Sequence, residues 1–392
     1  MRNLIVDFIN THPIVTETPT QQPSQGNDFE CNQDGYLQYL AKWTPEQKCT
    51  SRDPTNPEFQ KRLEYFIDAC NNIHYWNMEE EYKMEFTFYA DWHPDEFMEI
   101  TKTKPIYRKS LPVFPIMPIH NNSNWRHLMP SVTPCDYDVD DDYSSYSLSM
   151  ANCRPQNCSV SWAFAVTNSI EYAIKQLYLE EFDQTISVSL SAQELIDCVG
   201  KEHGLEYEAC SGLPIEWGFD YIYDNGIAFS QYYPHTNMED ECVQVDDEKK
   251  YHIAGYDKPI VYNKRGLFEL VMRGPTAVTL GLDPEYFQYY GSDNVVGPYF
   301  DSVLTTNQWQ ASVHGVVVEY YQYESDGSDT IPNWPFFAIE TRLRPCNSNV
   351  FRIPILETTD DDNIAGIAGY AIRPIVSEIL ATPEPTTPNH SS

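Results

Sequence analysis

The chain has little positive charge and no long hydrophobic run. Its 392 residues include 25 Lys and Arg against 58 Asp and Glu, which gives a formal net charge of −33. A surface this acidic repels the phosphates of nucleic acids and the headgroups of anionic lipids. No apolar segment approaches the roughly 20 residues that a membrane-spanning helix needs. We therefore expect neither nucleic acid nor a membrane as a binding partner.

Cysteines are also too few for a disulfide scaffold, at ten in 392 residues. No C-x-x-C pair or Cys/His cluster has the spacing of zinc ligands, so we expect no metal and no cofactor. The first ten residues, MRNLIVDFIN, are too short and too polar for a signal peptide. What the chain does contain is 41% hydrophobic residues, which is enough to build a packed core.

Composition and periodicity divide the chain into five segments. They are a flexible N-terminal arm (1–30), a helical segment (31–97), a proline-rich extended linker (98–134), a main domain (135–376) and a disordered tail (377–392). In the main domain, helix formers dominate 161–179 and 191–198, and strand-like runs follow at Thr276–Leu282, Ser312–Tyr321 and Phe336–Thr341. The predicted fold class is α+β, with a helical half before a β-rich half.

The most informative stretch is residues 156–164, which read QNCSVSWAF. This stretch resembles the C-G-S-C-W-A-F run of the papain (cathepsin-type) cysteine protease family, which a glutamine shortly precedes. On this resemblance, Cys158 matches the disulfide-forming cysteine and Ser161 stands at the position of the nucleophilic cysteine. Gln156 is the nearest candidate for the oxyanion-hole glutamine, although it lies one residue closer to Cys158 than the family spacing.

Further segments resemble the same family in the same order along the chain. They are the prodomain helix positions Glu58, Arg62, Phe66, Ile73 and Asn77, and then Leu190–Cys198, Cys210–Gly212, Gly274–Leu280, Ser312–Val318 and Ile364–Ala368. His314 takes the place of the catalytic histidine. The resemblance implies a papain-like two-lobed fold, with a helical left lobe and a β-barrel-like right lobe. A helical, inhibitor-type prodomain at 31–97 and a linker over the cleft at 98–134 would precede it.

The resemblance also implies disulfides between Cys158 and Cys210 and between Cys198 and Cys242. Extra bridges Cys31–Cys70 and Cys135–Cys153 are compatible with the sequence, but sequence does not fix connectivity, and reduced buried thiols remain the alternative. The cysteine pattern slightly favours an extracellular or lumenal location. A cytosolic location stands close behind, because no signal peptide is visible.

Serine at position 161 removes the thiolate on which the family's chemistry depends. The helix N-terminus and an imidazolium lower a cysteine pKa by several units, whereas a serine hydroxyl starts far less acidic. His314 would then have to act as a general base, with a third group orienting its ring. The family uses an asparagine there, and alignment of residues 336–343 places Thr341 at that position. We therefore expect a degenerate catalytic site.

Each of these residues also has a purely structural explanation. Ser161 can serve as a helix N-cap, His314 as a satisfied core histidine and Gln156 as a loop-packing residue. The glycine turn of the substrate cleft is changed as well. Leu213 replaces its last glycine, and we expect the leucine side chain to stand where a substrate backbone should approach.

The sequence therefore predicts a catalytically inactive homologue, not an enzyme. It would retain its prodomain in the cleft and act as a binding or structural scaffold for protein partners in a larger assembly. Two alternatives stay open. One is a slow serine-type hydrolase that uses Ser161 and His314. The other is a decoy module that binds protease ligands without cutting them, which requires an open cleft.

Overall fold

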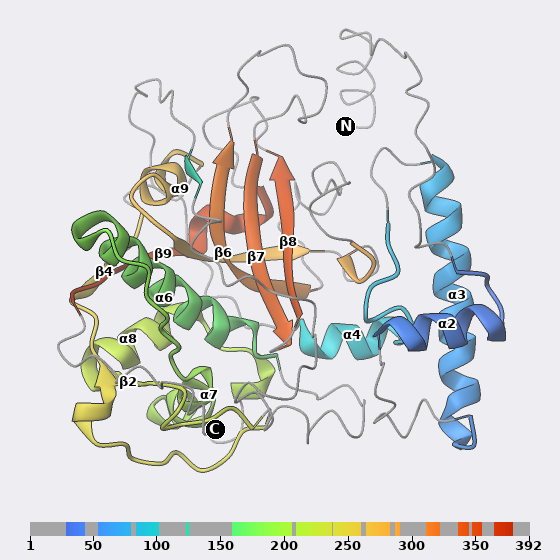
Figure 1. The fold of residues 1–392 in the computed structure, drawn as a ribbon, viewed down its shortest axis with the longest axis horizontal. Helices are drawn as coiled ribbons and strands as arrows, with labels where there is room; N and C mark the ends of the chain where they lie inside the picture. Colours follow the sequence, from blue (N-terminus) through green and yellow to red (C-terminus); the bar gives the residue numbers. More distant parts are fainter. Residues whose placement is uncertain are drawn as a thin grey trace, which may run out of the picture.

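The computed structural model describes residues 29–43, 54–79, 84–101, 123–124, 159–205, 209–236, 238–259, 264–282, 287–290, 311–321, 336–344, 347–354 and 364–378. Three groups of helices and strands make up this part of the chain (Figure 1): an N-terminal helical region, a helical lobe and an antiparallel sheet. The arm up to residue 28, most of the linker and the tail beyond residue 378 lie outside the described residues. No helix within the described ranges is long and apolar enough to cross a membrane.

The N-terminal region, called the prodomain below, consists of helices α2 (Gln33–Trp43), α3 (Pro57–Glu79) and α4 (Pro94–Ile100). Helix α3 lies in the segment predicted to be helical, and it has an apolar face, because Phe66, Ala69 and Ile73 are all buried. Asn56 accepts a hydrogen bond from the backbone of residue 58 and so begins α3, next to the proline at its first position. A disulfide joins Cys31 to Cys70, so one of the two extra bridges considered above is present.

The helical lobe is built on α6 (Ser161–Phe182), whose first fourteen residues are almost all buried. Around α6 pack α7 (Ala192–Glu202), α8 (Ile215–Asn225) and the short 3-10 helices η4 (Ala209–Ser211) and η5 (Asp247–Lys249), with a two-stranded sheet of β2 (Ile227–Ala228) and β3 (Lys250–Tyr251). Ser191 caps α7 through its hydroxyl, one residue before the helix begins. The Cys198–Cys242 disulfide implied by the resemblance is present.

The third group is a seven-stranded antiparallel sheet with the order β4-β9-β5-β6-β7-β8, in which β1 also pairs with β6. Its strands are β1 (Ser123–Asn124), β4 (Gly255–Asp257), β5 (Thr276–Leu282), β6 (Ala311–Tyr321), β7 (Phe336–Arg344), β8 (Asn347–Pro354) and β9 (Ala371–Ile375), and α9 (Lys264–Val271) and the 3-10 helix η7 (Ile364–Tyr370) pack with it. All three predicted strands are found. The predicted α+β class and two-lobed arrangement with a helical prodomain are confirmed.

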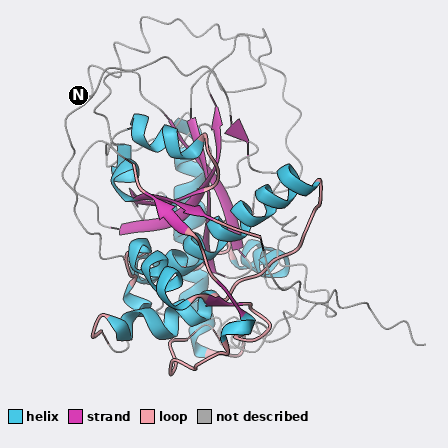
Figure 2. Ribbon diagram, turned by 90° about the vertical axis from the view of Figure 1, so that its left-hand side faces the viewer, coloured by secondary structure: helices cyan, strands magenta, loops and turns pink. Residues whose placement is uncertain are grey.

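The described residues form two large hydrophobic cores, and one of them joins regions that are far apart in the sequence. One core belongs to the helical lobe, with Trp162 and Phe219 at its centre. The other runs continuously from the prodomain into the sheet, so that Phe66 and Phe97 belong to the same cluster as Val317. Figure 1 shows the sheet between α6 of the helical lobe and α4 of the prodomain, and Figure 2 shows the strands beside the helices from the left-hand side of that view. The prodomain and the sheet lobe therefore share one core.

Candidate active-site region

Ser161 and His314 come together where α6 meets the sheet. Ser161 is the first residue of α6, and His314 lies within β6, the strand between β5 and β7. The Ser161 hydroxyl oxygen accepts a hydrogen bond from the backbone N–H of His314 at 3.3 Å. Both residues are fully or almost fully buried. The serine hydroxyl is thus engaged with the backbone of the histidine.

The His314 imidazole is held by a neighbouring strand. Its Nδ1 lies 2.8 Å from the hydroxyl of Thr279, which stands directly opposite on β5. Its Nε2 is buried and has no hydrogen-bond partner in the described part of the structure. Burial away from water lowers the pKa of His314 to about 3, because the charged ring would lose its hydration. At neutral pH the ring is therefore uncharged, and no ion pair with position 161 is available.

Thr341 does not orient the imidazole. Its hydroxyl donates to the backbone carbonyl of His314 at 2.7 Å, which ties β7 to β6 at this point. Thr341 makes no hydrogen bond to the imidazole ring. Nδ1 bonds Thr279, and Nε2 has no partner among the described residues. Thr279 was not anticipated from the sequence, although the antiparallel register of two predicted strands would have placed it opposite His314.

The predicted N-cap role of Ser161 is wrong. Val160 occupies the N-cap position of α6 with no side-chain cap, and Ser161 follows as the first helical residue. The serine oxygen points to β6 and bonds His314, so it satisfies a strand donor rather than a donor of its own helix. The partner of the serine oxygen is therefore a backbone amide and not the imidazole ring.

The segment before α6 is tied to the turn that carries Cys210. The Ser159 backbone N–H donates to the Cys210 carbonyl at 2.8 Å, and the Trp162 indole N–H donates to a carbonyl of η4. Cys210 is disulfide-bonded. Cys158 and Gln156 lie outside the described residues, so the predicted Cys158–Cys210 pair and the oxyanion-hole role of Gln156 stay predictions.

The expectation for Leu213 is wrong. Its side chain is 1% exposed and belongs to the core of the helical lobe, beside Gly200. The preceding Gly212 has a φ of +79° and supplies the left-handed turn at this point. The leucine therefore fills the interior of the lobe instead of projecting toward a substrate, because the turn directs its Cβ inward.

The prodomain is bonded to the sheet lobe through a short segment, residues 287–290. The Gln288 side chain donates to the backbone carbonyls of Tyr89 and Trp92, at 2.8 and 3.0 Å. Thr87 returns a hydrogen bond from its hydroxyl to the Gln288 carbonyl at 2.7 Å. The backbone of Glu85 also bonds the segment, and Met84 forms an isolated bridge with it. The contact is therefore directional as well as hydrophobic.

Both described flanks of the linker are attached to β6, the strand of His314. The Thr101 carbonyl accepts a hydrogen bond from the backbone N–H of Ser312, two residues before the histidine. Farther along, β1 pairs with β6 through Ser123 opposite Tyr320. The two attachments lie on either side of position 314 along the strand. The predicted path of the intervening linker residues, 102–122, lies outside the described residues.

Comparison with known proteins agrees with this architecture. The family model described as papain family cysteine protease matches residues 139–334. Curated relatives include Testin-2 of Rattus norvegicus, 29% identical over 183 residues, and the thiol protease SEN102 of Hemerocallis, 27% identical over 172 residues. The matches cover 45% and 44% of this chain and 49% and 42% of those proteins, so the chain spans about half or less of their length.

Solved structures of proforms resemble the chain over more of its length. Digestive procathepsin L 3 of Tenebrio molitor gives a TM-score of 0.63 at 21% identity, covering 88% of this chain and 99% of that one. The proform of the ragweed pollen allergen Amb a 11 gives 0.61 at 18% identity, covering 88% and 95%. At such identities the likeness shows the fold alone. That fold includes a helical region before a two-lobed domain.

Proposed function

Because the chain belongs to the papain family of cysteine proteases, we propose that it is a catalytically inactive member that keeps its prodomain. In this proposal it acts as a binding or structural scaffold for other proteins. The single observation that carries the proposal is the state of His314. Its ring is buried, has a pKa lowered to about 3, and is bonded to Thr279 rather than to Ser161.

This geometry opposes general-base catalysis by His314. A base must reach the proton that it removes and must have a pKa near the working pH. Here the serine oxygen bonds the histidine backbone, and the imidazole Nε2 is sealed away from solvent. Papain-type chemistry also needs a low-pKa thiol, which a serine cannot supply. Thr341 gives the ring no orienting contact, since its hydroxyl bonds the backbone.

The prodomain contacts favour a retained prodomain. Its aromatic residues share a core with the sheet, and Gln288, buried completely, makes two hydrogen bonds to prodomain carbonyls. Removing the prodomain would expose this apolar surface and leave the Gln288 side chain without those partners, at a cost of about 1–3 kcal/mol for the polar group alone. A peptidase must release its prodomain to work, whereas a scaffold gains rigidity from keeping it.

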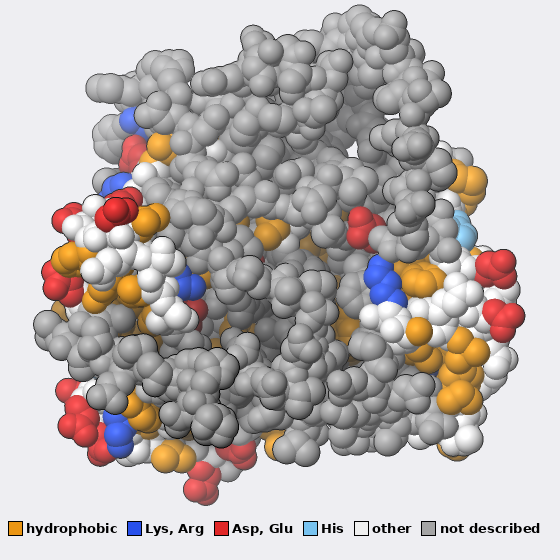
Figure 3. All heavy atoms as spheres, viewed as in Figure 1, with side chains coloured by type: hydrophobic (Ala, Val, Ile, Leu, Met, Phe, Trp, Pro, Cys, Tyr) orange, Lys and Arg blue, Asp and Glu red, His pale blue; other side chains and the backbone are white. Residues whose placement is uncertain are grey.

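If the prodomain stays in place, the outer surface of the protein is the part that binds partner proteins. On the prodomain, large hydrophobic side chains are exposed on α2 and α3, namely Leu37, Tyr75 and Met78 at 41%, 54% and 77%. Figure 3 shows hydrophobic side chains at the surface in the region of these two helices.

The test compares the natural serine with a restored cysteine. The full chain and its Ser161→Cys variant are incubated with fluorogenic peptides and with iodoacetamide. We expect no peptide cleavage by either, and alkylation of the introduced thiol no faster than that of an ordinary buried thiol, because no imidazolium faces it. Cleavage by the natural chain that is lost in Ser161→Ala would establish the serine hydrolase instead. Cleavage by the cysteine variant alone would show an intact site that lacks only its nucleophile.

A binding assay separates the scaffold from the decoy. A decoy must leave its cleft open to peptides, so a fluorescent peptide should bind the full chain at micromolar concentrations. The scaffold keeps its prodomain in place, and such a peptide should not bind. Intact-mass measurement of the protein from its source provides the second readout, because loss of residues 31–97 would contradict a retained prodomain.

A further inference from the structure

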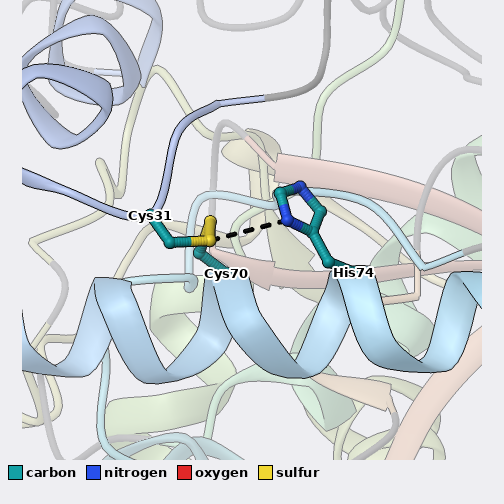
Figure 4. Close-up of side chains that lie close together, drawn as sticks. All are labelled: Cys31, Cys70 and His74. Carbon is teal, nitrogen blue, oxygen red and sulfur yellow. Dashed lines mark hydrogen bonds between the residues drawn. A yellow bond between two sulfur atoms is a disulfide. The ribbon is translucent and has the colours of Figure 1, made fainter.

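Two disulfides of the chain lie in different surroundings. Cys31–Cys70 is next to the ring of His74 on α3, whose Nδ1 lies 3.5 Å from the Cys31 sulfur (Figure 4). Cys198–Cys242 instead forms part of the wall of a cavity in the helical lobe, with a volume of about 520 Å³. Sites for small molecules usually measure about 300–1,000 Å³, so this cavity has the size of a ligand site.

The wall of the cavity comes from three parts of the helical lobe. They are the C-terminal half of α7, the C-terminal half of α8 and the segment 242–250. The charged and amide side chains that line it are Lys201, Glu202, Asn225, Gln244, Asp247 and Lys250. Neither Ser161 nor His314 lines the cavity, so it is separate from the family's catalytic position.

Lys250 is held in this wall by a buried ion pair. Its Nζ lies 2.7 Å from Glu194 Oε1, and the two side chains are 7% and 1% exposed. Glu194 also accepts hydrogen bonds from the Tyr221 hydroxyl at 3.1 Å and from the Ala228 backbone N–H at 2.6 Å. The position of the ammonium is therefore fixed before any ligand arrives, because the carboxylate that holds it is itself held by two other groups.

The Lys250 ammonium has one donor left for a ligand. An ammonium carries three N–H groups. In the described part of the chain, two of them are used, for Glu194 and for the backbone carbonyl of Asn225 at 3.3 Å. A buried donor without an acceptor costs free energy, so the third N–H needs an oxygen atom in the cavity. A ligand carboxylate is the strongest acceptor for such a cation.

The other charges of the lining are of both signs. Lys201 is half-buried and donates to the Asp240 carbonyl at 3.1 Å, whereas Glu202 and Asp247 are exposed. A simple anion would meet the carboxylates of Glu202 and Asp247 and the field of a chain with net charge −33. A simple cation would meet the ammonium groups of Lys201 and Lys250. A molecule that carries one charge of each sign matches both halves of the lining.

We propose that this cavity binds a small zwitterion, an amino acid or a dipeptide. The ligand carboxylate accepts hydrogen bonds from Lys250 and Lys201, and the ligand ammonium faces Glu202 and Asp247. The Gln244 amide is in the lining and matches a peptide group, which both donates and accepts. The Cys198–Cys242 bridge and Val245 supply the apolar part of the wall.

The experiment titrates the full chain, with its disulfides intact, with L-alanyl-L-glutamine. Isothermal titration calorimetry and saturation-transfer difference NMR measure the binding. The N-acetylated and the C-terminally amidated forms of the dipeptide each lack one charge, and sucrose tests whether hydroxyl groups are enough. Lys201→Gln and Asp247→Asn change the lining. Their matched controls are Lys249→Gln and Asp246→Asn, which alter an exposed ion pair that does not line the cavity.

We expect the dipeptide to bind with a dissociation constant of about 1 mM or below. Removal of either terminal charge should weaken binding by about tenfold or more. Lys201→Gln and Asp247→Asn should each weaken it by about three- to fivefold, and the control variants should leave it unchanged. No binding at about 10 mM would overturn the proposal. Equal binding of sucrose or of the amidated dipeptide would also overturn it, and so would equal losses in Asp246→Asn and Asp247→Asn.

Discussion

The prodomain interface and the Ser161–His314 region both contain buried polar side chains, and each has one atom without a partner in the described structure, Gln288 Oε1 and His314 Nε2. They differ in what the remaining hydrogen bonds connect. At the interface, the Gln288 amide and the Thr87 hydroxyl connect two regions of the chain through well-formed hydrogen bonds. At the family's catalytic position, His314 Nε2 has no hydrogen-bond partner in the described structure. The Ser161 hydroxyl accepts a hydrogen bond from the His314 backbone amide. The comparison teaches that the prodomain is fixed to the sheet by side-chain hydrogen bonds, whereas the side chains of Ser161 and His314 do not bond each other.

The largest effect is expected within the prodomain, at Arg62. Its guanidinium bonds both carboxylate oxygens of Glu96 and the carbonyl of Asp91, and the arginine is 4% exposed. Arg62→Met should lower the free energy of unfolding by about 3 kcal/mol, because it leaves a half-buried carboxylate and a carbonyl without their donor. Urea denaturation followed by fluorescence measures the change. Lys61→Met, one residue earlier and exposed, should change it by less than about 0.5 kcal/mol, and equal losses would contradict the role given to Arg62.

A somewhat smaller effect is expected at the interface itself. Gln288→Leu keeps the approximate volume but removes both donors to prodomain carbonyls. The free energy of unfolding should fall by about 2 kcal/mol, and the prodomain should become more susceptible to limited proteolysis. Gln231→Leu, at an exposed position, is the matched control and should have no such effect. Unchanged proteolysis of the Gln288 variant would show that the shared core alone holds the prodomain.

In the Ser161–His314 region, low pH should reduce the folding stability through protonation of His314 in the unfolded chain. The pKa of the ring is 6.5 in the unfolded chain and about 3 when folded, so only the unfolded state takes up its proton between these values. Stability from this residue is therefore complete above pH 6.5 and is lost as pH falls toward 3, by about 1.4 kcal/mol per pH unit. Between about pH 6.5 and pH 5 the loss is about 2 kcal/mol. His314→Gln should remove this part of the pH dependence, and identical curves for both chains would refute the burial effect.

The smallest effect is expected for Ser161→Ala. This change removes one long hydrogen bond, at 3.3 Å, to the His314 amide, and should cost about 1 kcal/mol or less. Thermal unfolding of the two chains under the same conditions measures it. Ser159→Ala provides a neighbouring control, because the Ser159 hydroxyl is buried without a partner in the described structure. A loss of several kcal/mol at Ser161 would indicate a larger structural role than the one described.

Much of the fold could be predicted because its signals are local. Segment 31–97 was predicted to be helical, and the three- and four-residue spacing of Phe66, Ala69 and Ile73 on α3 matches its buried face. The strand Thr276–Leu282 was predicted with the same bounds that the structure has. The disulfide between Cys198 and Cys242, which was expected only from the family resemblance, is present.

The details of the catalytic region could not be predicted, because they depend on cross-strand pairing and on turn geometry. Thr279 meets His314 only because β5 and β6 are in that register. The direction of Leu213 was predicted wrongly, because it follows from the left-handed turn at Gly212, which the sequence does not reveal. Likewise, the sequence left the Cys31–Cys70 bridge open, because Cys31 lies 39 residues from Cys70 and reaches it only after the prodomain has folded.

The hydrogen bond between Thr87 and Gln288 joins residues 201 positions apart, and this separation sets an order of folding. The helical lobe closes on itself within residues 160–253, apart from a few contacts with the sheet strands, and can form early. The prodomain, although synthesised first, shares its core with residues as late as Ile353 and Ile367, so its apolar face is covered only after most of the chain has been made. That face therefore stays exposed longest during synthesis.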